Sequence, residues 1–149
     1  CRAAQIGYIL ALCENANPEK VTAMCLIHDI AEIRIGDAHR IAQRYLDIPP
    51  AEKKAFDEQM QNLPPNIAKR FKSLWKEFND QKTPEAVIAR DSDLLETMLQ
   101  AKEYLDTGYL GAKRWLKNGS KYLKTASAKK LFREIQKNQF TDWWDKLNK

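Results

Sequence analysis

Apolar residues recur every three or four positions along most of the chain, and no stretch shows sustained strand-like alternation. This spacing predicts amphipathic helices, and segments rich in proline, glycine and asparagine divide them. We expect helices at about 2–14, 19–34, 50–61, 65–79, 84–106, 109–117, 126–137 and 140–147. The sequence therefore predicts an all-α fold of roughly six to eight helices.

Two of these helices have clear start signals. Asn17 precedes Pro18, and Thr83 precedes Pro84, so each helix begins with a capping side chain followed by proline at its first position. Within 84–106 the apolar residues are spread widely around the helix, which indicates burial on several sides. We expect this helix to be central.

The length of 149 residues suits one domain with its own hydrophobic core, so we expect residues 1–149 to form a single domain. No apolar run approaches the 18 or so residues that span a bilayer, and the first residues lack the pattern of a secretory signal. Three cysteines are an odd number for a disulfide framework. We expect a cytoplasmic protein with no membrane contact.

Charge is unevenly distributed. Residues 1–106 contain 14 Lys and Arg against 17 Asp and Glu, whereas residues 107–149 contain 11 against 3. An acidic first part suits a site that holds cations, while a basic tail suits an anionic partner or a solvated helix surface. The tail also contains interleaved aromatic residues, namely Trp115, Phe132, Phe140, Trp143 and Trp144. Base stacking on nucleic acid is one interpretation; we favour packing on the core or on a second subunit, which makes a homodimer the expected assembly.

The segment 23–39 contains the most informative polar residues. His28, Asp29 and Glu32 lie three or four positions apart in a mostly apolar predicted helix, so they share adjoining parts of one helical surface. Imidazole and carboxylate are suitable ligands for a divalent metal. Asp93 lies in another apolar helix, where an unpaired charge is costly, and is the natural further ligand. Asp91 competes with Asp93 for this role.

The chain contains the His28-Asp29 pair, then Glu32 and Gly36-Asp37, and later the helical segment Asp93-Leu94-Leu95-Glu96. In these residues the chain resembles the HD-domain phosphohydrolase superfamily. The similarity is greatest to the branch that contains 5'-deoxynucleotidases, and it covers most of residues 1–106. It implies a single-domain HD-type helical bundle. From the spacing of the tail aromatics, we expect residues 107–149 to form a basic helical tail packed on the same domain.

The resemblance implies that His28, Asp29 and Asp93 are metal ligands and that one more histidine comes from an earlier helix. That histidine is expected a couple of residues before Cys1. Either the sequence continues upstream or this member lacks one ligand, and a start inside a predicted helix without Met favours the first explanation. Mixed His and Asp ligation accepts Mn, Co, Fe, Ni, Zn or Mg.

By the same resemblance, Glu32 and Asp37 are the acid and base groups that orient the attacking water and assist the leaving alcohol. Gly36 suits a helix end in a left-handed conformation that turns Asp37 back over the site. Arg34 and Arg2 are candidate phosphate contacts, although a plain surface position is the favoured interpretation for each. His39 is a loop residue that we expect to be exposed.

These features support two hypotheses. The first is a metal-dependent phosphomonoesterase that acts on nucleoside 5'-monophosphates or similar small phosphate esters. The alternative is a non-catalytic helical module whose basic C-terminal third binds nucleic acid or an acidic protein. We favour the enzyme and do not expect nucleic acid as a partner.

Overall fold

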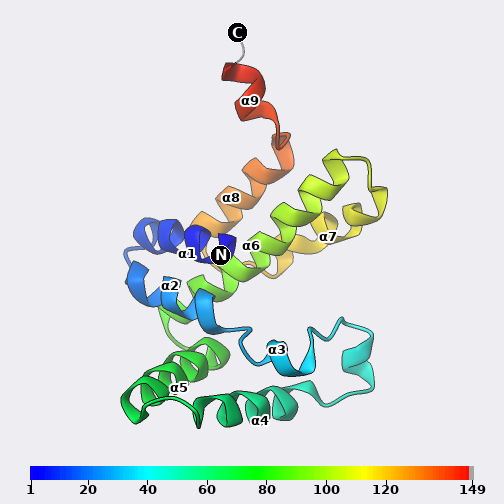
Figure 1. The fold of residues 1–149 in the computed structure, drawn as a ribbon. Coiled ribbons are helices and arrows are strands. Elements are labelled where there is room, and N and C mark those ends of the chain that lie inside the picture. Colours follow the sequence, from blue (N-terminus) through cyan, green and yellow to red (C-terminus); the bar gives the residue numbers. More distant parts are fainter. Residues whose placement is uncertain (148–149) are drawn as a thin grey trace.

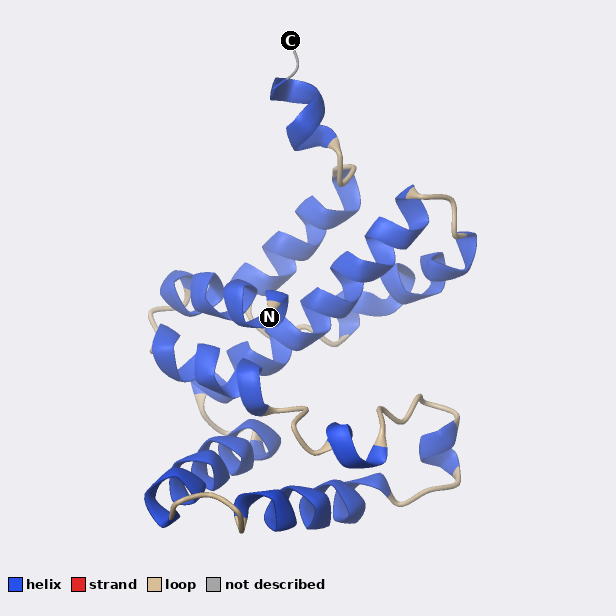
Figure 2. Cartoon of the chain, viewed as in Figure 1, coloured by secondary structure: helices blue, strands red, loops and turns tan. Residues whose placement is uncertain are grey.

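The structure is a computed structural model that describes residues 1–147, and it contains helices and loops without any strand in that range (Figures 1 and 2). The α-helices are α1 (Arg2–Cys13), α2 (Pro18–Ile27), α3 (Glu32–Ile35), α4 (Ile48–Met60), α5 (Pro65–Asp80), α6 (Pro84–Asp106), α7 (Lys113–Asn118), α8 (Ala126–Lys137) and α9 (Asp142–Leu147). Short 3₁₀ turns are η1 (Ala42–Arg44), η2 (Leu110–Ala112) and η3 (Gly119–Lys121). The all-α prediction is confirmed.

The predicted helix starts are also confirmed. The Asn17 side chain accepts a hydrogen bond from the amide of Lys20 at 2.9 Å, and Thr83 Oγ1 accepts one from the amide of Ala86 at 3.2 Å. Each bond satisfies an amide that the first turn of a helix leaves without a partner. These caps fix where α2 and α6 begin; α6 contains Asp93, and α2 leads directly into the turn that contains His28 and Asp29.

Helix α6 is central, as predicted, and contacts α1, α2, α5, α7 and α8 (Figure 1). Its interior residues Ile88 and Leu95 are almost fully buried, and each such burial stabilises the fold by roughly 1.5–3 kcal/mol. The main core around it also takes in Leu10, Val21, Met24 and Phe78, among others. Because α6 is held on several sides, Asp93 has a rigid support.

A second, smaller core lies between α4, α5 and the segment after α2. It is built from Ala31, Ala55, Phe56 and Met60. Phe71 and Trp75 on α5 pack against both cores and join them. The interpretation of the chain as one domain remains a prediction. The packing of Phe71 and Trp75 against both cores is the structural feature that supports it.

The predicted continuous helix over 19–34 is wrong. Helix α2 ends at Ile27, residues 28–31 form a turn, and α3 begins at Glu32. The carbonyls of His28 and Ile30 accept hydrogen bonds from the side chains of Trp75 (3.2 Å) and Gln59 (2.9 Å). These distant donors replace the amides that a continuous helix would have supplied. His28, Asp29 and Glu32 therefore do not share one helical surface.

The basic tail only partly follows the prediction. Helices α7 and α8 pack on α6, and Phe132 is buried. Helix α9 extends beyond the rest of the molecule (Figure 1), and Trp115, Trp143 and Trp144 are exposed. Packing on this chain's own core is therefore wrong for these three tryptophans. Residues 148–149 of the predicted tail lie outside the described residues.

Among residues 1–147, none of the helices combines the length and the apolar character that crossing a membrane requires. The three cysteines are free thiols, Cys25 buried and Cys1 and Cys13 exposed.

Candidate metal centre

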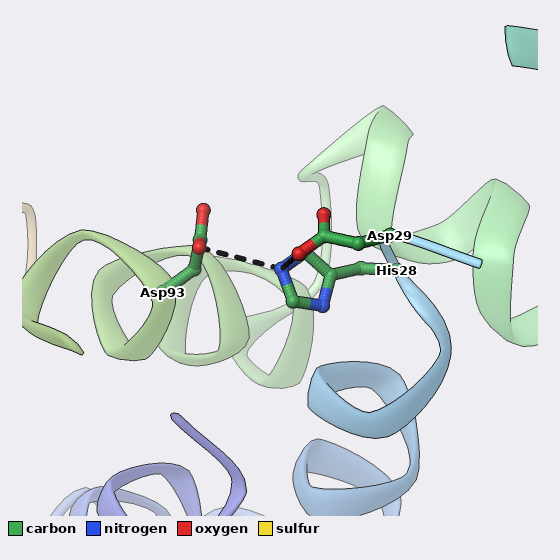
Figure 3. A group of neighbouring side chains, drawn as sticks. All are labelled: His28, Asp29 and Asp93. Carbon is green, nitrogen blue, oxygen red and sulfur yellow. Dashed lines mark ion pairs between the residues drawn. The ribbon is translucent and has the colours of Figure 1, made fainter. Parts of the chain in front are cut away.

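Three predicted ligands converge from two parts of the chain. His28 and Asp29 lie in the turn that follows α2, and Asp93 lies in α6 and faces them (Figure 3). His28 Nε2 is 2.9 Å from Asp29 Oδ2 and 3.3 Å from Asp93 Oδ1. One ligand atom of each residue lies within 4.8 Å of the others. The structure thus brings together the three side chains that residue type and the family resemblance had both indicated.

The orientation of the His28 ring is fixed on several sides. Its Nδ1 lies 3.0 Å from the carbonyl oxygen of Cys25, to which it donates, and its ring packs on Phe78 with centroids 4.9 Å apart. Only 8% of the side chain is exposed. A histidine that donates through one ring nitrogen to a carbonyl presents the other nitrogen as a ligand.

The chemistry of this group fits a divalent cation. Nε2 is buried, and neither carboxylate contact has the direction of a hydrogen bond, so Nε2 has no hydrogen-bond partner among the described residues. Burial alone would lower the pKa of His28, but Asp29 and Asp93 outweigh it and raise this pKa to about 10. The two carboxylates thus make this position favourable for positive charge. When the imidazole is neutral, it and the two carboxylates are a suitable set of ligands for a divalent cation.

The centre is open on one side. Asp29 is 56% exposed, and the three ligands line a pocket of about 590 Å³. Cys1, Ile33 and Glu96 contribute to the same lining. The N-terminal end of α1 therefore borders the candidate metal centre.

A second group of acids, Glu32, Asp37 and Glu52, lies near the centre. Burial, followed by the charges of Asp29, Asp37 and Glu52, raises the pKa of Glu32 to about 7. Burial and the charge of Asp29 also raise the pKa of Glu52, on α4. A carboxyl with a pKa near neutrality can both accept and release a proton. Glu32 is therefore chemically suited to the proton-transfer role that the resemblance gave it.

The predicted turn at Gly36 is found in a modified form. Gly36 follows α3 with φ 77° and ψ 157°, a positive φ as expected, but the residue is extended rather than left-handed helical. Asp37 is exposed and lines a neighbouring pocket of about 440 Å³, together with His39 and Leu46. Its charge nevertheless acts on Glu32.

The two predicted phosphate-binding arginines are engaged by protein carboxylates. Arg34 Nη1 donates to Glu58 on α4 at 3.0 Å. Arg2 donates to Glu96 at 2.9 Å and to Glu103 at 2.7 Å, which joins α1 to α6. A phosphate bound by either arginine would compete with these partners.

Asp91 and His39 lie outside the centre. Asp91 is 1% exposed and accepts hydrogen bonds from the amides of Lys124 and Thr125 and from the Thr125 hydroxyl, at 2.7–3.1 Å. It therefore anchors the start of α8 and takes no part in the group formed by His28, Asp29 and Asp93. His39 is exposed, as predicted, and its Nδ1 accepts from the amide of Ala42.

Three residues near the site were not predicted. Arg90 donates from Nη1 to Asp93 Oδ2 at 3.0 Å, Glu52 reaches the acid cluster from α4, and Trp75 holds the carbonyl of His28. Arg90 precedes Asp93 by three positions, a spacing that places both on one helix face, so its contact was accessible from sequence. Glu52 and Trp75 come from other helices and have no local signal.

The fold and the site together define the class of protein: an all-helical bundle with a candidate metal centre, made of a His-Asp pair and a distant Asp. The chain belongs to the HD domain family, because the model of that family matches residues 2–136.

The curated relatives include 5'-deoxynucleotidase HDDC2 from Bos taurus, which is 34% identical over 98 residues, or 62% of this chain and 46% of the relative. The protein of the same name from Xenopus laevis is 35% identical over 91 residues, or 59% of this chain and 44% of the relative. A 5'-deoxynucleotidase from Erwinia tasmaniensis is 29% identical over 119 residues, or 70% of this chain and 58% of the relative. The chain thus spans about half the length of the curated relatives it matches.

Proposed function

We propose that this chain carries the site of a metal-dependent phosphomonoesterase that acts on nucleoside 5'-monophosphates or similar small phosphate esters. The observation that carries the proposal is the convergence of His28, Asp29 and Asp93 around a buried Nε2 that has no hydrogen-bond partner among the described residues. Three protein donors leave coordination positions for water or substrate, as catalytic sites require.

His28, Asp29 and Asp93 would hold the ion, which would supply Lewis acidity toward a phosphoryl oxygen and the attacking water. Glu32 takes up the proton of that water, since its pKa of about 7 allows it to be a base near neutral pH. Asp37, whose charge acts on Glu32, assists the leaving alcohol. The water oxygen forms the new bond to phosphorus while the ester P–O bond breaks, which yields an alcohol and inorganic phosphate.

The substrate class rests on the relatives, which are named 5'-deoxynucleotidases. We therefore infer a preference for deoxynucleoside 5'-monophosphates. The pocket of about 590 Å³ is within the range of small-molecule sites. The metal is one of Mn, Co, Fe, Ni, Zn and Mg, and a screen with each ion will identify it.

Alanine substitution tests the proposal. His28→Ala and Asp93→Ala should each lose both bound metal and hydrolysis of deoxynucleoside 5'-monophosphates. Asp80→Ala is the matched control, because Asp80 is an exposed residue at the end of α5 that pairs only with Lys76 among the described residues. Metal content by mass spectrometry and phosphate release are the measurements, and undiminished hydrolysis in either ligand variant would reject the assignment.

We further propose a cytoplasmic homodimer. Exposed aromatic residues on α7 and α9, among them Trp115, Trp143 and Trp144, support a second subunit as partner, and free thiols are compatible with a reducing compartment. Light scattering at several concentrations tests the dimer.

Function that resists EDTA but falls steeply with salt would instead favour the binding-module alternative.

A further inference from the structure

Arg90 lies one helical turn before Asp93, and the two oxygens of the Asp93 carboxylate have different neighbours. Asp93 Oδ1 faces His28 Nε2 at 3.3 Å, whereas Asp93 Oδ2 accepts a hydrogen bond from Arg90 Nη1 at 3.0 Å. The guanidinium is thus separated from the candidate metal centre by a single carboxylate group. No other arginine is hydrogen-bonded to one of the three candidate ligands within residues 1–147.

The Phe78 ring lies beside the guanidinium of Arg90. The central carbon of this guanidinium is 5.9 Å from the centroid of the Phe78 ring, and the same ring packs against His28 at 4.9 Å. A planar guanidinium over an aromatic face is favourably placed by its charge and loses little further freedom when it binds an anion. Arg90 is therefore oriented by Asp93 and Phe78 together.

The guanidinium keeps donors available for a ligand. Its side chain is 44% exposed, and within the described residues its only hydrogen bond uses Nη1. The remaining N–H groups match the oxygen spacing of a phosphate, which guanidinium binds bidentately. Arg2 and Arg34 are bound to Glu96, Glu103 and Glu58, so they are less available.

The charges of the site also call for a cation at this position. Asp29, Glu32 and Glu52 would repel a dianionic phosphate ester, and a single divalent ion compensates only part of this charge. Arg90 acts on the acid cluster from α6, since its charge opposes the effect of burial on the pKa of Glu52. Arg90 therefore contacts the candidate ligand Asp93 directly and acts by its charge on the acid Glu52.

We propose that Arg90 is a phosphate-binding residue of this site, with Nη1 on Asp93 and its other donors on two non-bridging oxygens of a dianionic phosphomonoester. This inference rests on the proposed function and adds a substrate contact to it. Inorganic phosphate, the product of the proposed reaction, should bind to the same donors.

Binding of inorganic phosphate to the metal-loaded protein, measured by calorimetry, tests the proposal without turnover. Arg90→Gln should weaken phosphate binding at least tenfold and leave the metal dissociation constant within about threefold. Arg90→Lys should lie between wild type and Arg90→Gln, because lysine keeps the charge but loses the bidentate geometry. Arg133→Gln, an exposed arginine on α8, is the matched control and should bind phosphate as wild type does.

Steady-state kinetics supply the second measurement. Arg90→Gln should raise the KM for a nucleoside 5'-monophosphate and the inhibition constant of phosphate together. Equal phosphate affinity in wild type and Arg90→Gln would overturn the proposal while leaving the phosphatase assignment intact. A loss of metal affinity as large as the loss of phosphate affinity would also overturn it, because Arg90 would then only position Asp93. Absence of hydrolysis in wild type with every metal would reject the proposed function, and the calorimetric result for phosphate would still stand by itself.

Discussion

Replacing Glu32 by glutamine should stabilise the metal-free protein at alkaline pH while it removes activity. Glu32 is partly buried beside Asp29, Asp37 and Glu52, and its pKa is raised from 4.5 to about 7. Glutamine has nearly the same shape but never ionises, so the substitution removes the unfavourable charge without opening a cavity.

The sign follows from the proton balance. Below pH 4.5 Glu32 is protonated in the folded and the unfolded chain, so its ionisation does not affect stability. Between pH 4.5 and 7 the unfolded chain loses this proton first, and the free energy of unfolding falls as pH rises. Above pH 7 the loss is complete and constant. The glutamine variant lacks this loss, so its advantage grows across that interval.

The magnitude is limited by solvent. A pKa change from 4.5 to about 7 corresponds to an upper bound of roughly 3 kcal/mol, at about 1.4 kcal/mol for each pH unit. Glu32 is only partly buried, so screening reduces the expected gain to about 1 kcal/mol. For a chain of this length, that gain raises Tm by roughly 2–4 °C.

Urea unfolding with chelator at pH 4.5 and pH 8 measures the effect. Glu58→Gln is the matched control, since Glu58 is an exposed acid on α4 whose ion pair with Arg34 is worth little, and this variant should gain nothing at pH 8. The reasoning is refuted if Glu32→Gln has the same effect at both pH values or is less stable than wild type at pH 8. Its kcat should fall by about 10²–10⁴-fold, as expected for loss of a general base.

Three further predictions concern the ligands and their support. With a His28 pKa of about 10 in the metal-free protein, metal binding at pH 7.5 should release about one proton, which calorimetry in buffers of different protonation enthalpy will detect; no release would contradict the assignment of His28 as a ligand. Asp91→Asn should lower the free energy of unfolding by about 2–3 kcal/mol and keep metal binding. Asp93→Asn should lower the free energy of unfolding by about 1 kcal/mol or less and lose the metal. Urea unfolding and metal titration measure the two effects. Gly36→Ala should cost roughly 1 kcal/mol through its positive φ alone, because an added Cβ would meet no atom within 4 Å; a loss above about 3 kcal/mol in urea would show that another interaction is involved.

Local signals were sufficient for the elements that depend on neighbouring residues. The caps at Asn17 and Thr83 and the full extent of α6 followed from the sequence, because capping and helical periodicity act within a few positions. The helix break after Ile27 did not, since the donors from Trp75 and Gln59 lie 47 and 29 positions away from the carbonyls they bind.

The candidate site divides in the same way. The ligands His28, Asp29 and Asp93 were indicated by their types and by the family resemblance, and the structure brings them together. The partners of Arg2 could not be anticipated, because Glu96 and Glu103 are 94 and 101 positions distant. Tertiary contacts of this kind decide whether a predicted side chain remains available to a ligand.

The turn at residues 28–31 connects ligand geometry to the mutual docking of the two cores. The carbonyl of His28 is held by Trp75, whose ring stacks on Phe56 at 4.6 Å in the second core, while the imidazole of the same residue packs in the main core. Any loosening of α4 and α5 from the bundle would release that carbonyl and let the imidazole rotate away from Asp93. The affinity of the centre for metal would therefore depend on how firmly the two cores are joined. A conservative change at Phe56, which contributes no ligand atom, would change the position of His28 Nε2.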